Sequence, residues 1–585
     1  MAHAHPNGFR RGTDGSGTGR TLVIILHGWN AKANSMHDVE QAVRQSHAGL
    51  DGLDIYLPLL PHANLFSFAS AARTVAGLTD AIDILCANPD RYARLVLVGH
   101  SMGAVLARRL FLVAAGADSL VPSEPELRGR QKRHWAARIE RIVTLGGLNR
   151  GWTNSGRLSW VETIVANLIA VLGHGSPASK KPIAFQIRRG APFIVQTRLQ
   201  WLAMTRLATP LPLVIQLLGT RDSLVGPDDA VDFATDNDSY YFLELPNTEH
   251  TDAIHFSGAA GAAREALFRT ALTADRDELA PLKIPFAHLT DSLPPRSDPS
   301  ITHVVFVIHG IRDEGYWTRK IAQRIHERAE RDGRDGAGIR CITSSYGYFT
   351  ILPFIFPWIR MGKVEWLMDL YVGARAQFPE ARFSYVGHSN GTYLAARALL
   401  DYPAISFHNV LFAGSVVRRD YDWRVLCEQG RVRSVVNMIA TADWVVGFFS
   451  TALEPGRGFF DVGGAGFGGF TRPYANGPVH ELRFVTGGHG AGVTEEHWPE
   501  IAAFIVDDVT PVPPVPANKQ STVWRMASRV STLLVLTALV LLAGWIVHIL
   551  WPIVSDPHTT ALAAAGRVGA VLAIFGLVRF IVTRV

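Results

Sequence analysis

A short motif that occurs twice constrains this chain more than any other feature. Residues 99–103 read Gly-His-Ser-Met-Gly, and residues 387–391 read Gly-His-Ser-Asn-Gly. Each copy follows a short apolar run typical of a strand and precedes an alanine-rich stretch typical of a helix. The two glycines permit a sharp strand-to-helix turn, which lifts the serine hydroxyl clear of the backbone. The repetition predicts two similar folding units with exposed serines at Ser101 and Ser389.

The two halves share further segments in the same order. Continuous apolar runs end in His-Gly at residues 21–28 and 303–310, as parallel strands covered on both faces require. Two later segments, 219–226 and 440–447, share the pattern T-x-D-x-[LV]-V-G. The remaining matches are residues 142–150 with 410–418 and residues 241–250 with 482–489. Strands that alternate with helices predict a mostly parallel sheet with helices on both faces.

Serine, then aspartate, then histidine, each directly after a strand, is the order found in α/β-hydrolases. On these motifs each half resembles an α/β-hydrolase of the lipase/esterase type, over about residues 20–272 and 301–507. The resemblance implies an α/β fold class with two α/β-hydrolase domains. The apolar runs near the C-terminus, taken up below, add a transmembrane helical hairpin to this expectation.

The same resemblance implies a catalytic triad in each half. Ser101 would be the first nucleophile, with His250 as its base and Asp222 orienting the imidazole. The second triad would be Ser389, His489 and Asp443. Two histidines, His255 and His497, also follow the final strands and are alternative bases. Asp228 and Asp229 are alternative acids in the first half.

The oxyanion formed in acyl transfer needs backbone N–H groups aimed at it. By the family pattern, these donors are Trp29 and Met102 in the first half, and Ile311 and Asn390 in the second. No metal-ligand spacing and no nucleotide-binding glycine loop occurs, so no cofactor and no metal is expected.

Proline-rich stretches mark the domain boundaries. One contains Pro281, Pro285, Pro294, Pro295 and Pro299, and the other is the Pro-Val-Pro-Pro-Val-Pro run at 511–516. The predicted organisation is 1–19 a flexible N-terminus, 20–274 a first α/β-hydrolase domain with a cap at about 151–209, 275–300 a linker, 301–508 a second α/β-hydrolase domain, 509–522 a proline-rich linker and juxtamembrane segment, and 523–585 a two-span membrane anchor.

The predicted cap lies where the first half is longer than the second. An apolar helical cap fits a substrate with a fatty portion, and a helix pair that fills core is the alternative.

The C-terminal segment has the composition of a membrane anchor. Residues 530–551 form an apolar run that is long enough to cross a bilayer and has His548 as its only strongly polar side chain. Residues 561–582 are a weaker second span, because they include Arg567 and Arg579. Basic residues precede the first span, and none lies in the connection between the spans. The positive-inside rule therefore predicts both ends in the cytoplasm, with the catalytic domains on that face.

Composition excludes some function classes. The formal charge is only +6 over 585 residues and the basic residues are scattered, so nucleic acid is not an expected partner. The 3 cysteines lie far apart and fit a reducing compartment. The N-terminus lacks a signal-peptide pattern.

These observations predict a membrane-anchored serine hydrolase of carboxylic esters that forms an acyl-enzyme. An acyl-ester or lipid-like substrate and the membrane are its expected partners. Thioesterase or amidase activity is the alternative, as is one catalytic half beside a binding or scaffolding half. We also expect that truncation before Lys519 leaves folded, active domains.

Overall fold

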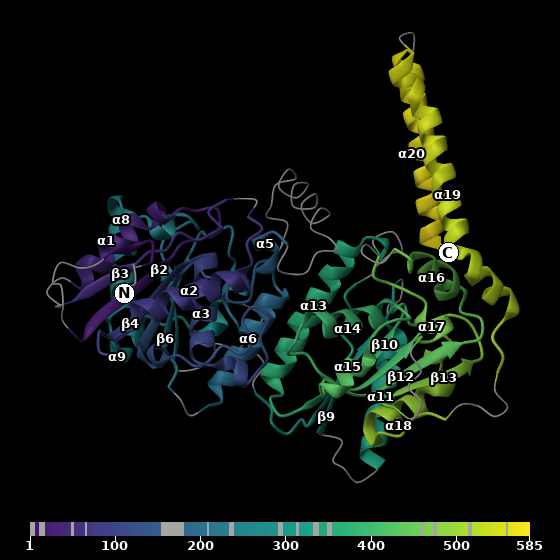
Figure 1. The fold of residues 1–585 in the computed structure, drawn as a ribbon, viewed down its shortest axis with the longest axis horizontal. Helices are drawn as coiled ribbons and strands as arrows, with labels where there is room; N and C mark the ends of the chain where they lie inside the picture. The colour runs from purple at the N-terminus through teal and green to yellow at the C-terminus, as the bar shows by residue number, and fades with distance from the viewer. Residues whose placement is uncertain are drawn as a thin grey trace. The chain divides into compact units, whose positions relative to one another are not determined.

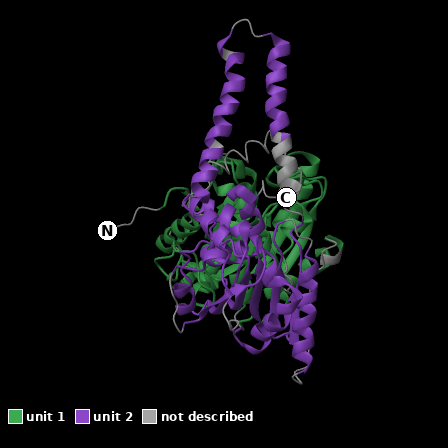
Figure 2. Cartoon of the chain, turned by 90° about the vertical axis from the view of Figure 1, so that its right-hand side faces the viewer, with its two compact units in different colours: residues 1–297, 365–379, 401–404 green, residues 298–364, 380–400, 405–585 purple. Residues whose placement is uncertain are grey.

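Two β-sheets, both dominated by parallel strands, organise the chain in the computed structural model (Figure 1). Two compact units contain them (Figure 2). Unit 1 comprises residues 1–297, 365–379 and 401–404, and unit 2 comprises 298–364, 380–400 and 405–585. The structure describes residues 6–10, 18–47, 52–64, 67–153, 181–207, 210–232, 239–289, 297–311, 315–331, 338–347, 354–456, 460–471, 477–512, 518–556 and 560–584.

The sheet of unit 1 has seven strands in the order β1-β3-β2-β4-β5-β6-β7. Only β1 is antiparallel, to its neighbour β3. The strands are β1 Phe9–Arg10, β2 Arg20–Leu26, β3 Leu53–Tyr56, β4 Tyr92–His100, β5 Ile139–Leu145, β6 Leu213–Gly219 and β7 Tyr240–Leu245. The α-helices described in this part of the chain are α1 His37–Ser46, α2 Ala71–Leu85, α3 Met102–Ala114, α5 Ile183–Gln186, α6 Pro192–Thr205, α7 Pro227–Ala230, α8 Gly258–Thr273, α9 Arg276–Leu279 and α10 Phe286–Leu289.

The sheet of unit 2 has six strands, all parallel, in the order β13-β12-β11-β10-β8-β9. These strands are β8 His303–Ile308, β9 Ile339–Ile342, β10 Arg382–His388, β11 Phe407–Ala413, β12 Val432–Ala440 and β13 Val479–Val485. Among the described residues after 297, the α-helices are α11 Tyr316–Arg331, α13 Pro357–Gln377, α14 Asn390–Asp401, α15 Trp423–Glu428, α16 Thr451–Leu453, α17 Ala465–Gly468, α18 Trp498–Asp507, α19 Thr522–Ser555 and α20 Ala561–Arg584.

The two sheets share one strand order. From β3 to β7, unit 1 runs β3-β2-β4-β5-β6-β7, and unit 2 runs β9-β8-β10-β11-β12-β13. In each, the first long strand lies between the second and the third, which requires crossover connections between parallel neighbours. This arrangement is consistent with the α/β-hydrolase fold class expected from the sequence.

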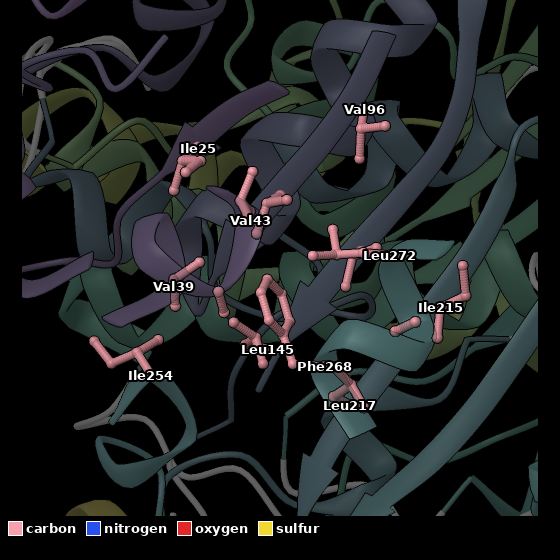
Figure 3. Packing of buried hydrophobic residues seen from close by; sticks show 14 of the residues in the cluster. Ile25, Val39, Val43, Val96, Leu145, Ile215, Leu217, Ile254, Phe268 and Leu272 are labelled. Atoms are coloured by element: carbon pink, nitrogen blue, oxygen red, sulfur yellow. The ribbon is translucent and has the colours of Figure 1, made fainter. Parts of the chain in front are cut away.

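Apolar side chains on the central strands explain why the helices cover the sheets. Every residue of β2 and β8 is buried, as in strands with both faces covered. On one face of the first sheet, Ile25 and Leu217 pack with Val39 of α1 and with Phe268 and Leu272 of α8 (Figure 3). In unit 2, α11 and α18 pack on each other and contribute to the equivalent core.

Helix α13 belongs partly to each unit, because residues 365–379 are counted with unit 1. Within unit 1, Asp369 accepts hydrogen bonds from Arg150 at 2.7 Å and from Arg198 at 2.6 Å. The Arg198 side chain is fully buried and also contacts Asp232 at 2.9 Å. Burial alone would raise the pKa of Asp369, but Arg198 and Arg150 lower it to about 2. Segment 365–379 therefore supplies a charge that compensates a buried arginine.

Several segments expected to be irregular are ordered where the structure describes them. The N-terminus, expected to be flexible over 1–19, contributes β1, because Phe9 and Arg10 pair with β3. The 275–300 linker contains α9 and α10, and Asp275 with Glu278 forms a capping box at the start of α9. Local capping thus orders residues that lack a longer helical pattern. Residues 290–296 of this linker lie outside the described residues.

The cap predicted at about 151–209 is described only in part, because 154–180 and 208–209 lie outside the described residues. Its described portion contains α5 and α6. Nearly all of α6 is buried, including Trp201, and α6 packs against α3. This helix therefore forms part of the core of unit 1.

Among the described residues, one helix is long and apolar enough to cross a membrane, at Thr522–Ile553 in α19. A shorter apolar stretch, Ala561–Ile574, lies in α20, which packs on α19. Both helices are counted with unit 2 (Figure 2).

Two candidate Ser-His-Asp sites

Each motif serine lies in the turn between a strand and a helix. Ser101 separates β4 from α3 and has φ 53° and ψ −118°. Ser389 separates β10 from α14 and has φ 51°. Positive φ is unfavourable for a serine and is held only where the surrounding structure requires it. Both serines therefore occupy the strained turn that the two motifs predict.

The glycines of the motif allow this turn to pack closely. A Cβ atom on Gly103 would lie 2.1 Å from the carbonyl oxygen of Leu26. A Cβ atom on Gly391 would lie 2.5 Å from the carbonyl oxygen of Ile308. In both units the helix after the serine thus approaches the end of the neighbouring strand too closely for any side chain.

In unit 1, the predicted acid and base are in contact. His250 Nδ1 lies 2.8 Å from Asp222 Oδ2. The other oxygen, Asp222 Oδ1, accepts hydrogen bonds from the backbone N–H groups of Leu224 at 3.0 Å and Val225 at 2.8 Å. The Asp222 side chain is almost completely buried. Because the carboxylate is anchored at both oxygens, it can fix the orientation of the imidazole ring.

Unit 2 has the same pair. His489 Nδ1 lies 3.0 Å from Asp443 Oδ2 and 3.1 Å from Asp443 Oδ1. Asp443 is fully buried, and its Oδ1 accepts the backbone N–H of Val446 at 3.0 Å. The His489 side chain is 20% exposed, against 9% for His250, so the second imidazole is more open to solvent.

The alternative residues are placed elsewhere. His255 is half exposed, and its nearest carboxylate is Asp38 at 4.0 Å. His497 lies 3.3 Å from Glu500 on the next helix. Asp228 is exposed, whereas Asp229 forms an ion pair with Arg189 at 2.7 Å. The contacts therefore favour Asp222 with His250 and Asp443 with His489.

In each unit, two consecutive residues at the end of one strand contact the serine and the histidine. The Ser101 N–H donates to the Leu145 carbonyl at 2.9 Å, and a Cβ on the next residue, Gly146, would lie 3.1 Å from His250 Cε1. The Ser389 N–H donates to the Ala413 carbonyl at 3.1 Å, and a Cβ on Gly414 would lie 2.8 Å from His489 Cε1. The serine turn and the histidine ring thus lie against consecutive residues at the end of β5 in unit 1 and of β11 in unit 2.

Gly146 and Gly414 were not among the residues singled out from the sequence. They have φ 56° and 54°, and any side chain there would collide with the histidine ring. Their signal was present, because both glycines occupy the same place in the segments that match between the halves.

The histidine before each serine contacts the histidine of its own site. His100 Nε2 lies 3.1 Å from the His250 carbonyl oxygen, and His388 Nε2 lies 3.1 Å from that of His489. Burial, with a smaller effect from His250, lowers the pKa of His100 to about 3. His100 is therefore neutral at physiological pH, and its Nε2–H donates to the carbonyl. This contact ties the strand end to the loop that contains the base.

The His-Gly turns lie against the serines. A Cβ on Gly28 would be 3.0 Å from Ser101 Cβ, and one on Gly310 would be 2.6 Å from Ser389 Cβ. Trp29 and Ile311, the predicted oxyanion donors, come next in the chain. The other predicted donors, Met102 and Asn390, begin α3 and α14, where backbone N–H groups lack an intrahelical acceptor.

The support behind these turns differs between the two units. His27 and His309 each place Nδ1 against the carbonyl of the following glycine, at 2.9 and 2.8 Å. The His27 carbonyl oxygen lies 3.1 Å from His62 Nε2, whereas the His309 carbonyl accepts from Tyr346 Oη at 3.0 Å. In unit 2 the Asn390 side chain also donates to Tyr346 Oη at 3.2 Å. The second site is thus braced by a tyrosine where the first uses a histidine.

Among the described residues, no group of three or more His, Cys, Asp or Glu side chains could hold a metal ion.

Comparison with known proteins gives similarity in structure only. No protein-family model matches the chain, and no curated protein matches its sequence. The solved structures of similar fold include phospholipase PlaB from Legionella pneumophila, at 14% identity and a TM-score of 0.32. That match covers 47% of this chain and 64% of the phospholipase, which is less than two thirds of its length.

Two further matches cover more of the other protein. A soluble variant of monoglyceride lipase from Saccharomyces cerevisiae matches at 14% identity and a TM-score of 0.31, over 47% of this chain and 91% of that one. Esterase B from Lactobacillus rhamnosis matches at 13% identity and a TM-score of 0.30, over 48% and 89%. At these TM-scores the likeness carries no inference about substrate.

Proposed function

We propose that this chain is a serine hydrolase of carboxylic esters with two Ser-His-Asp sites. One observation carries the proposal: in both units a buried aspartate contacts Nδ1 of a histidine, at 2.8 Å and 3.0 Å, beside a serine in a strained turn. A turn serine with only a structural role needs neither a positive φ nor an aspartate–histidine pair at the same strand ends.

The reaction proceeds through an acyl-enzyme. Ser101 Oγ attacks the ester carbonyl carbon while His250 takes the hydroxyl proton, and Asp222 stabilises the imidazolium that results. The N–H groups of Trp29 and Met102 hold the negative oxygen of the tetrahedral intermediate. His250 then returns its proton to the departing alkoxide, which leaves as the alcohol. A water molecule adds to the acyl group by the same route, releasing the carboxylic acid and free serine.

The second site uses Ser389, His489 and Asp443 in the same roles, with Ile311 and Asn390 as N–H donors. We infer that α19 and α20 form a two-span anchor. Lys519, just before α19, and Arg525 and Arg529, in its first turns, precede the apolar span and favour a cytoplasmic position for both units. An acyl-ester or lipid-like substrate is supported by this anchor.

Fluorophosphonate labelling tests the proposal, because the probe reacts with a serine only when its histidine and oxyanion donors are in place. We expect the wild type, Ser101→Ala and Ser389→Ala to be labelled, and the double variant to be unlabelled. An unlabelled wild type would exclude a serine hydrolase. Labelling lost completely in one single variant would assign a binding or scaffolding role to the other half.

Thioesterase and amidase activities use the same residues and are compared directly. Matched esters, thioesters and amides of one acyl chain, assayed with each single variant, give the leaving-group preference of each site. We expect the ester to have the highest kcat/KM at both sites.

A further inference from the structure

The residues just before α19 are hydrogen-bonded to the loop that holds the acid of the second site, to strand β13, which precedes the base, and to α17. The backbone N–H of Ser521 donates to the Thr441 carbonyl at 2.8 Å, two residues before Asp443. The Asn518 side chain donates to the Phe484 carbonyl at 2.8 Å, and the Gln520 side chain donates to the Phe467 carbonyl at 2.6 Å. The proline-rich linker expected over 509–522 therefore does not end as a free spacer. Its amide side chains pair with backbone carbonyls of unit 2 before α19 begins.

Aromatic contacts continue this connection. The ring of Trp524, in the first turn of α19, lies 6.1 Å from the ring of Trp444, the residue after Asp443. Trp444 also contacts Phe449 at 5.8 Å, and Phe449 contacts Phe448 at 5.3 Å. The rings of Trp444, Phe448 and Phe449 belong to or adjoin the π-helical segment η9 (Val445–Ser450). Both η9 and α16 pack against α19, and α16 and α19 can be followed in Figure 1.

The surface formed by η9 and residues 518–530 has the chemistry of a bilayer interface. Phe449 is 44% exposed, Val523 is 70% exposed and Met526 is 63% exposed. Exposed basic side chains alternate with these apolar ones at positions 519, 525 and 529, and residues 518–530 contain no aspartate or glutamate. Aromatic and basic side chains together at the end of an apolar helix are typical of the headgroup region, and the positive charge fits anionic lipids.

Geometry and chemistry therefore point to a coupling that the sequence did not predict. We propose that residues 518–524 hold the acid loop of the second site against the bilayer surface, so that this site takes an amphipathic ester directly from the membrane. The inference rests on the proposed hydrolase function of Ser389. In this role Trp524 and Ser521 are positioning residues, since they act on Asp443 through Trp444 and Thr441. The described contacts of the first triad in unit 1 involve none of residues 518–524, so Ser101 should be independent of this segment.

The chain provides an internal control, because its two serines can be labelled separately. The full-length protein is reconstituted in vesicles of phosphatidylcholine with an anionic phospholipid. Trp524→Ala is combined with Ser101→Ala, so that labelling reports on Ser389 alone, and with Ser389→Ala, so that labelling reports on Ser101 alone. We expect the rate of fluorophosphonate labelling at Ser389 to fall about tenfold, as loss of an aromatic pair implies, and that at Ser101 to stay the same. Trp524→Phe should restore the rate of labelling at Ser389. Trp551→Ala, which removes an exposed tryptophan of the same helix, should alter neither serine.

Charge is tested separately from packing. With an ester lipid in the vesicles, hydrolysis by the Ser101→Ala protein should rise with the anionic fraction. In the Arg525→Gln, Arg529→Gln double variant this dependence should disappear, while hydrolysis of a short soluble ester is unchanged.

The outcomes separate this inference from the proposed function. If Trp524→Ala leaves the labelling rate at Ser389 within twofold of wild type, or lowers the labelling rates of both serines equally, the coupling is wrong even though the hydrolase assignment stands. An unchanged dependence on anionic lipid in the charge variant would refute the membrane-facing surface. If Ser389 is not labelled even when residues 518–530 are unchanged, the proposed function of the second site itself is refuted.

Discussion

Replacing Asp222 by asparagine isolates what its carboxylate does for His250. Asp222 Oδ1 accepts two backbone N–H groups, from Leu224 and Val225, and Oδ2 faces His250 Nδ1 at 2.8 Å. In Asp222→Asn, the amide oxygen has to remain on the two backbone donors, which leaves the amide NH₂ facing the imidazole. The ring then has to present its Nδ1 lone pair and carry its proton on Nε2. In that tautomer it cannot accept the serine proton.

Loss of the correct tautomer costs about 10⁴-fold in turnover. This corresponds to about 5 kcal/mol of transition-state stabilisation. Folding should change little, because the backbone hydrogen bonds are kept. The assay is hydrolysis of a soluble ester by the Ser389→Ala protein, in which only the first site can react, with thermal unfolding measured in parallel. Asp228→Asn, at the exposed alternative acid, is the matched control and should stay near wild type. If Asp222→Asn kept more than a tenth of the activity, or if Asp228→Asn lost it, the assignment of the acid would be wrong.

Three further predictions concern stability. In Gly103→Ala the new Cβ would lie 2.1 Å from a strand carbonyl, so we expect a large fall in melting temperature. The control Gly77→Ala, in the open middle of α2, should be neutral or slightly stabilising. Equal melting temperatures for the two variants would contradict the close packing of the turn. Burial lowers the pKa of His62 and of His100 to about 3, so both stay neutral in the folded protein while the unfolded chain gains protons below about pH 6.5. The free energy of unfolding should therefore fall as the pH decreases from about 7 to about 4, by up to about 1.4 kcal/mol per pH unit for each histidine, and a flat profile would show that they are not buried as neutral groups. Asp369→Asn leaves a buried arginine with less compensating charge and should cost roughly 3–5 kcal/mol in the stability of unit 1, measured by chemical denaturation; an unchanged unfolding midpoint would mean that water or another group compensates the arginine.

The sequence was sufficient to predict which aspartate and which histidine lie in contact in each unit. The acid, the base and the serine each come after a strand, and two copies of each pattern allowed the halves to be matched. Asp222 and Asp443 could be chosen because both occupy the shared T-x-D segment. In the structure they are the aspartates that contact His250 and His489.

What the sequence did not predict depends on contacts between distant segments. Asp369 lies on a helix whose pattern reads as part of the second half, yet its partners, Arg150 and Arg198, are far away in the chain. Residues 518–521 look like a spacer because single amide-to-carbonyl hydrogen bonds leave no periodic pattern. The truncation expected to spare both sites would remove the Ser521 and Trp524 contacts, so on our inference it spares only the first.

The histidine before each serine shows why a neutral donor is needed at that position. In both sites its Nε2 lies 3.1 Å from the carbonyl oxygen of the histidine that acts as the base in our proposal. During the reaction that base becomes an imidazolium, so a permanent cation beside it, such as lysine or arginine, would disfavour proton uptake. At position 100 a buried imidazole avoids this repulsion, because its pKa of about 3 keeps it uncharged while its N–H still donates. A serine or threonine would also be neutral, but its short side chain would not span the distance from the strand end to the loop. Histidine at position 100 thus combines reach, a donor and the absence of charge, and His388 makes the same contact with the carbonyl of His489 in the second unit.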